Sequence, residues 1–260
     1  MKGVWGKRVL NRQHPAARNL ASLWDFQSSP RSGPTRDLAR GKLSSATKVN
    51  RILTSAQLGP SMGITGVGSN GFQCSDGLPQ AVTRGFTFAC LYHYNSGSGA
   101  PVDNDSRFFL IHSGSAIVSF IADSGGSDFF IFSGLPQSAS RALLALRYDP
   151  AGTMHYLLCA SGCGTEQGGI FRTTDTQFDG TFSSASSDVM ALGASTDLTN
   201  QLDGGVYWAA TWDRCIPESV LLDLFRKPDG LFVRRRTALV GAAGGAAVYS
   251  PYYYRLLGAA

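Results

Sequence analysis

The sequence is poor in charged side chains and almost lacks glutamate. Charged residues make up 16% of the 260 residues, and the only glutamates are Glu166 and Glu218. Globular domains average about a quarter charged residues. Enzymes that hydrolyse glycosidic bonds need two carboxyl groups flanking the bond. The pattern places Glu166 in a loop and Glu218 at a helix start, and most aspartates fall in turns. We therefore expect a protein without enzymatic activity.

Long apolar runs are also missing, and the cysteines are few. No run is long enough to cross a bilayer, and residues 1–20 are basic and polar, so we expect neither a membrane partner nor a secretory signal. The five cysteines are scattered and odd in number, which predicts free thiols in a reducing compartment. Cys159 and Cys163 lie close together, but no second Cys or His pair accompanies them. We expect no bound metal or other cofactor.

Turn-forming residues, by contrast, are abundant. The chain has 31 glycines, and clusters of Ser, Gly, Thr and Asn interrupt it about every ten residues. This spacing predicts short strands joined by turns. Residues 95–106 and 161–188 are expected to be loops, and 44–70 carries only a weak pattern. The expected strands cover 23–26, 86–94, 108–112, 117–121, 129–132, 142–148, 153–159 and 189–193.

Residues 202–232 contain the strongest pattern. Asp203-Gly204-Gly205 is a turn signal, and the aromatic and β-branched run 206–212 predicts a buried strand. Pro217 then opens the one convincing helix, because proline is tolerated at a first helical position. Apolar residues recur along this helix at helical spacing, and residues 227–230 end it. The helix is expected to cap a strand-rich body.

Four segments in order resemble a known family. They are Leu-Ala-Ser-Leu-Trp-Asp-Phe at 20–26, Arg-Asp-Leu-Ala-Arg-Gly-Lys-Leu at 36–43, Phe-Thr-Phe-Ala-Cys-Leu-Tyr at 86–92, and the strand and helix at 202–226. Together they resemble the concanavalin A-like jelly roll, in the laminin-G-like form found in tailed-phage virion proteins. The flanks His-Pro-Ala-Ala-Arg at 14–18 and Asp-Gly-Leu-Phe at 229–232 also resemble phage members of that family.

The resemblance implies an all-β protein: a two-sheet antiparallel jelly-roll sandwich with one short C-terminal capping helix and extended N- and C-terminal arms. We place a basic N-terminal arm at 1–19, the jelly-roll body at 20–227 and a C-terminal arm at 228–260. The implied function is a structural protein of the virion surface, assembled in the host cytoplasm. Capsid decoration is preferred over a tail or collar position.

The charge distribution suggests how such a body would be attached. Residues 1–51 carry eleven Lys or Arg against two Asp, and residues 226–260 carry six against one, whereas 52–225 carry six against fifteen acids. Two basic ends therefore flank an acidic body, which favours arms that bind an acidic partner. Solvated, non-binding ends remain the alternative. The residues expected to contact the partner are Trp5, Arg8, Arg12, Arg18, Arg234, Arg235, Arg236, Tyr252, Tyr253, Tyr254, Leu256 and Leu257.

The expected partners are virion proteins, either the major capsid protein or tail and collar subunits, with homo-oligomers in the assembled particle. Nucleic acid is not expected, because no helix suited to a DNA groove and no aromatic-basic sheet face is present. The alternative function is a carbohydrate-binding adhesin. Tyr92, Tyr94, Trp208 and Trp212 could offer a sugar platform, although their strand positions favour core packing. Asp103-Asn104-Asp105, or Asp123 with Asp128, could hold calcium.

Overall fold

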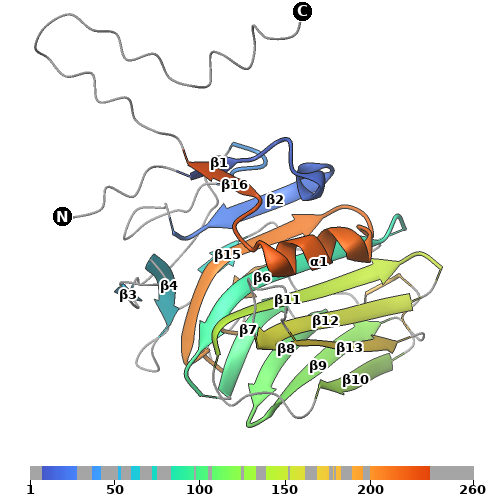
Figure 1. The fold of residues 1–260 in the computed structure, drawn as a ribbon. Helices are drawn as coiled ribbons and strands as arrows, with labels where there is room; N and C mark the ends of the chain where they lie inside the picture. Colours follow the sequence, from blue (N-terminus) through green and yellow to red (C-terminus); the bar gives the residue numbers. More distant parts are fainter. Residues whose placement is uncertain are drawn as a thin grey trace, which may run out of the picture.

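The chain folds into two large antiparallel sheets packed face to face and one small two-stranded sheet, with helix α1 across the outer side of the largest sheet (Figure 1). The expected all-β, two-sheet jelly-roll architecture is confirmed. The structure is a computed structural model, and it describes residues 8–27, 37–41, 52–53, 60–64, 72–74, 83–96, 98–104, 107–123, 126–132, 139–151, 153–161, 169–175, 178, 180–182, 189–195 and 200–234. No helix in these ranges is long and apolar enough to cross a membrane.

The smaller sheet has six strands in the order β10-β9-β8-β7-β14-β5. Strands β7 to β10 form a meander, in which each strand pairs with the next one along the chain. Its strands are β5 (Phe72–Cys74), β7 (Ser98–Asn104), β8 (Phe108–Ser113), β9 (Ala116–Asp123), β10 (Gly126–Phe132) and β14 (Met190–Leu192).

The larger sheet has eight strands in the order β13-β12-β11-β6-β15-β4-β3, with β2 also paired to β15. Strand β15, which the sequence predicts as the closing strand, lies next to β6, β4 and β2. The strands are β2 (Leu20–Asp25), β3 (Ile52–Leu53), β4 (Pro60–Ile64), β6 (Phe86–Tyr94), β11 (Ala139–Asp149), β12 (Thr153–Ser161), β13 (Gly169–Asp175) and β15 (Gly204–Trp212).

The central strands of the larger sheet are buried on both faces. All nine residues of β6 and all nine of β15 are buried. In β6, Phe86, Phe88 and Cys90 face the core between the sheets, whereas Ala89 and Leu91 face a second apolar cluster on the outer side. Side chains alternate between the two faces of a strand. Because both faces of these strands are apolar, each face must be covered by other parts of the protein. The second layer is covered by α1 and by segments from the two ends of the described chain.

Helix α1 (Glu218–Arg226) follows Pro217 and confirms the predicted capping helix. Leu221, Leu224 and Phe225 are its buried residues, and they recur at the spacing of one helical face. The short 3-10 helix η1 (Pro15–Ala17) is held beside it. The His14 Nε2 atom lies 3.2 Å from the Asp223 carboxylate, and the Trp212 indole N–H donates to the Ala16 carbonyl at 2.6 Å.

Several expectations about loops are wrong. Residues 95–106 were expected to form a loop but contain β7, in which Ala100 and Val102 are buried and neighbouring strands supply the hydrogen bonds. Residues 161–188 contain β13, paired with β12. The weakly patterned 44–70 contains β3 and β4. The other expected strands are confirmed. In each failure the strand is short or rich in Gly, Ser and Thr, so that its tertiary neighbours decide its structure.

Candidate binding site at the clasped termini

The two ends of the described chain form a small sheet of their own. Strand β1 (Arg8–Leu10) pairs antiparallel with β16 (Phe232–Arg234), with Arg8 opposite Arg234 and Leu10 opposite Phe232. The Asn11 N–H extends the ladder by donating to the Leu231 carbonyl at 2.7 Å. The Asn11 side chain donates to the Gly230 carbonyl at 3.1 Å. We call these strands and the polar network beneath them the terminal clasp.

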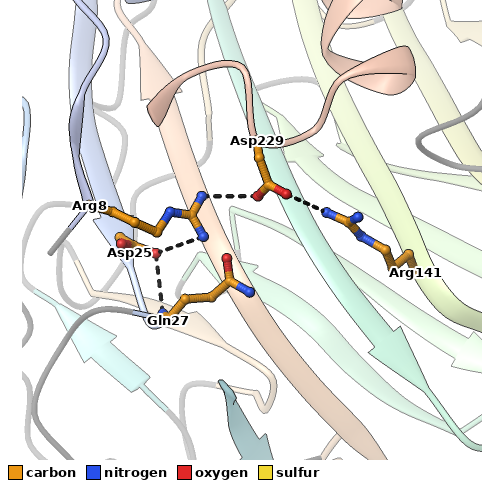
Figure 2. A network of polar contacts seen from close by, with 5 residues as sticks. All are labelled: Arg8, Asp25, Gln27, Arg141 and Asp229. Carbon is orange, nitrogen blue, oxygen red and sulfur yellow. Dashed lines mark hydrogen bonds and ion pairs between the residues drawn. The ribbon is translucent and has the colours of Figure 1, made fainter. Parts of the chain in front are cut away.

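Arg8 is the centre of the terminal clasp (Figure 2). Its guanidinium lies over the Phe232 ring, 3.6 Å from the ring centroid. One Arg8 nitrogen donates to Asp229 Oδ1 at 3.0 Å, and the other lies 3.5 Å from Asp25 Oδ1. The side chain is 11% exposed. Arg8 therefore joins β1 to β16, to the turn after α1 and to β2.

Asp229 extends the network to the body of the sandwich. Its second oxygen accepts from Arg141 of β11 at 3.0 Å, so one carboxylate bridges two guanidinium groups. Burial lowers the pKa of Arg8 from its ordinary value, and the charges of Asp25 and Asp229 oppose that change. The Asp25 carboxylate is 1% exposed and also accepts from the Gln27 backbone N–H at 3.2 Å. Two cations and two anions balance here, so the network serves to fix the two ends in place.

The terminal clasp brings the first and last described residues of the chain together. Because Arg8 and Arg234 are opposed in an antiparallel pair, residues 1–7 and 235–260 both leave the described region from the same end of the β1–β16 sheet. Lys7 precedes this point, and Arg235 and Arg236 follow it. The two positive regions of the sequence are therefore attached to the described chain at neighbouring points, Arg8 and Arg234.

The structure places four of the residues expected to bind a partner. Arg8 lies inside the terminal clasp rather than on a free arm. Arg12 and Arg18 are exposed near η1, and Arg234 contributes its backbone to β16. The other expected residues lie outside the described residues. They are Trp5, Arg235, Arg236, Tyr252, Tyr253, Tyr254, Leu256 and Leu257. The division at 19/20 and 227/228 stays a prediction, although residues 8–19 and 228–234 pack against the body.

Sequence reasoning missed Asp25, Arg141, Asp229 and Phe232 as members of the site. Asp229 and Phe232 belong to the flank that resembles phage members of the family, which was the one available signal. Asp25 stands in the first strand motif, where an acid within an apolar run is unusual. An acid that is buried in a strand requires a charged or hydrogen-bonding partner. That requirement was the signal for an arginine nearby, but it could not identify Arg8.

The features proposed for sugar and calcium lie mostly in the core. Tyr92, Tyr94, Trp208 and Trp212 are at most 1% exposed, which confirms that they are core residues rather than a sugar platform. Asp103 and Asn104 are buried, Asp105 lies outside the described residues, and Asp123 and Asp128 are described by their backbones alone. Within the described part of the chain, no three His, Cys, Asp or Glu side chains gather as a metal site would require.

No protein-family model matches the sequence, and no curated protein matches it. Several solved structures share its fold. The binding domain of botulinum neurotoxin DC, in complexes with SialylT and with rat synaptotagmin II, superposes with a TM-score of 0.58 at 11% and 10% identity. Both matches cover 81% of this chain and 52% of the neurotoxin chain.

A third similar structure is from botulinum neurotoxin type C, whose cell entry is dependent on interaction with two ganglioside molecules. It matches with a TM-score of 0.56 at 8% identity, covering 81% of this chain and 51% of that one. This chain therefore spans about half the length of the structures that it matches. At such low identity the likeness shows a shared β-sandwich fold.

Proposed function

We propose that this chain is a non-catalytic, carbohydrate-binding module. Its two termini attach it to a larger assembly. The attachment part of this proposal rests on the opposed pair Arg8 and Arg234, because the basic Lys7 precedes one member in the sequence and Arg235 and Arg236 follow the other. The fold shared with neurotoxin binding domains supports the recognition part, since one of these domains is in complex with SialylT, and cell entry of botulinum neurotoxin type C is dependent on interaction with two ganglioside molecules. Fold alone does not determine function, so each part needs its own experiment.

The body has the chemistry of a rigid platform rather than of a catalyst. Its central strands are apolar on both faces, and two buried histidines pack against aromatic rings. His112 Nε2 lies 3.0 Å from the Tyr92 hydroxyl, and the His93 ring packs against Tyr207. A glycan would therefore meet loop side chains at the rim of the sandwich rather than the aromatic residues of its core.

A glycan array probed with the full-length chain tests recognition. We expect saturable binding to a limited class of glycans, with sialylated chains represented, and competition by the same glycan free in solution. Circular dichroism should first show that the protein has a folded β-structure. If such protein binds no glycan on the array, the carbohydrate-binding part of the proposal is wrong. The attachment part would then stand alone.

The second candidate is a purely structural protein of a tailed-phage virion, most directly one that decorates the capsid surface. The order of the four sequence motifs supports it, as does the joint exit of the basic termini. In this candidate the partners are capsid, tail or collar subunits, and the body binds no sugar. Arginines followed by clustered aromatic residues, as at 234–257, are the residue types that dominate interface energetics.

Truncation after Arg234 tests the attachment, because it removes 235–260 but keeps β16 and the terminal clasp. The copy number of the chain in purified particles, measured by quantitative mass spectrometry, should fall to background. Exchanging Arg235 and Arg236 for glutamine should reduce it in the same direction. Exchanging Arg226 and Lys227, an exposed basic pair at the end of α1, is the matched control and should leave it unchanged. Normal copy number for the truncated chain would overturn attachment through this end.

A further inference from the structure

Strand β10 is the last described strand of the six-stranded sheet. Strand β10 pairs with β9 over all seven of its residues, from Gly126 opposite Asp123 to Phe132 opposite Ile117. Among the described strands, none is hydrogen-bonded to its other side. An open edge presents a row of backbone N–H and C=O groups that can pair with another strand. The edge of the larger sheet, β13, lies nearby but belongs to a different sheet.

Strand β10 lacks several of the features that prevent edge pairing, although its register places Asp128 on the same face as the core residue Phe108. Natural edges are protected by lysine, proline, bulges or a very short strand. The β10 sequence, Gly-Ser-Asp-Phe-Phe-Ile-Phe, contains neither lysine nor proline, and its register with β9 is continuous. Its one charged residue is Asp128. The edge is therefore long, regular and almost uncharged.

An exposed apolar residue marks the same strand. Ile131 is 63% exposed, and it is the only exposed large hydrophobic side chain among the residues whose side chains the structure describes. In β8, Phe108 and Leu110 belong to the core between the sheets, so alternation directs Phe109 and Ile111 to the opposite face. The cross-strand register links apolar residues in two rows, Phe109-Phe120-Phe129 and Ile111-Val118-Ile131.

We propose that this edge is a homodimer interface, in which β10 of one copy pairs antiparallel with β10 of a second copy around Phe130. In this register Phe129 lies opposite Ile131 of the second copy, so both apolar rows continue across the two-fold axis. Pairs of apolar residues in such cross-strand positions stabilise a sheet. The open backbone groups of both copies are satisfied at the same time.

The few charged residues of β8, β9 and β10 favour a second copy of this chain as the partner, and they favour the antiparallel orientation. Asp123 and Asp128 are the only acidic or basic residues in β8, β9 and β10 apart from His112, which is buried. A parallel pair in register would place Asp128 beside Asp128 of the second copy, and opposed like charges are unfavourable. The antiparallel pair around Phe130 places Asp128 opposite Phe132 instead. The strand is thus complementary to itself in one orientation.

Sedimentation equilibrium of the full-length chain, from micromolar to submillimolar concentration, tests the proposal. Measurements at about 1 M salt, where the screening length is about 3 Å, suppress association through the basic termini and so separate this interface from the proposed attachment. We expect a monomer–dimer equilibrium. Ile131→Lys should raise its dissociation constant by about tenfold or more, because each dimer contains two Ile131–Phe129 pairs and the lysine disrupts both.

Thr174→Lys is the matched control, since Thr174 is an exposed residue of β13, the edge strand of the other sheet. It should leave the dissociation constant unchanged. Hydrogen exchange on the unsubstituted chain provides a measurement that does not depend on a variant. The amides of β10 should gain protection as the protein concentration rises. A monomer at all concentrations, or a dimer equally affected by both substitutions, would overturn the proposal.

Discussion

The Arg8 guanidinium lies 3.6 Å from the centroid of the Phe232 ring, although 224 positions separate the two residues in the chain. The same guanidinium contacts Asp25 and Asp229, so a single side chain holds both ends of the described chain against the sandwich. Cation–π contacts contribute about 0.5–2 kcal/mol, with larger values where the cation is desolvated. The contact explains why a basic residue of an otherwise polar segment is almost fully buried.

Removing the Arg8 charge should destabilise the fold. We expect Arg8→Met to lower the free energy of unfolding by about 3 kcal/mol, because it leaves the buried Asp25 carboxylate without its cation. Urea unfolding followed by tryptophan fluorescence measures the change. In the double variant Arg8→Met/Asp25→Asn, most of the loss should be recovered, since the asparagine can still accept from the Gln27 N–H. Equal stability of the single variant and the parent would show that the network does not hold the termini.

Two tryptophans of β15 provide a matched comparison. The Trp212 indole donates to the Ala16 carbonyl, whereas the Trp208 indole N–H is buried without a hydrogen-bond partner. Both side chains are fully buried, so replacement by phenylalanine removes a similar apolar area from each. Trp212→Phe should cost about 1–3 kcal/mol more than Trp208→Phe, because it leaves the Ala16 carbonyl unsatisfied. Equal costs in thermal or urea unfolding would contradict the assigned hydrogen bond.

A buried histidine should make the stability depend on pH. His112 lies between the sheets, with its ring centroid 4.2 Å from that of Tyr94, and burial lowers its pKa to about 4. The unfolded chain therefore takes up a proton near the ordinary value of 6.5, while the folded chain does not. The free energy of unfolding should be highest above pH 6.5 and fall by about 3 kcal/mol as the pH decreases to about 4.

His112→Gln isolates this contribution, since glutamine keeps a hydrogen-bonding group near the Tyr92 hydroxyl but does not titrate. Burial also lowers the pKa of His93, so some pH dependence should persist in the variant. The difference between the two stability curves is the quantity to measure. Parallel curves between pH 4 and 6.5 would show that His112 does not titrate as its burial requires.

Local sequence patterns predict the elements whose own side chains provide their burial. The run from Phe86 to Tyr94 and the helix after Pro217 are in the structure as expected, because β-branched and aromatic residues favour strands and an apolar face favours a helix. The overall class follows from the number of such strands. Strand β7 was missed, since Gly99 and Pro101 weaken its local signal and strands β8 and β14 determine its structure.

The terminal clasp could not be predicted for a different reason. Its contacts connect residues more than 200 positions apart, and neither end carries a pattern that specifies the other. Arg8 in an acid-free segment reads as a solvent-exposed cation until Asp25, Asp229 and Phe232 are placed around it. What the sequence does predict is the excess of positive charge at both ends. The fold adds that Arg8 and Arg234, the first and last described residues, lie opposite each other.

A disulfide across the terminal clasp would test most directly whether the two termini leave the body together. Val9 and Val233 are register partners, and opposed residues of an antiparallel pair have Cα atoms about 4.5–5.5 Å apart, within the range of a disulfide. The variant Val9→Cys/Val233→Cys should form this crosslink under mild oxidation, identified by mass spectrometry, with a stability gain of up to about 5 kcal/mol. Val9→Cys combined with the exposed Arg226→Cys is the control and should not crosslink. Absence of the Val9–Val233 crosslink in folded protein would contradict the joint exit of the termini on which the proposed attachment depends.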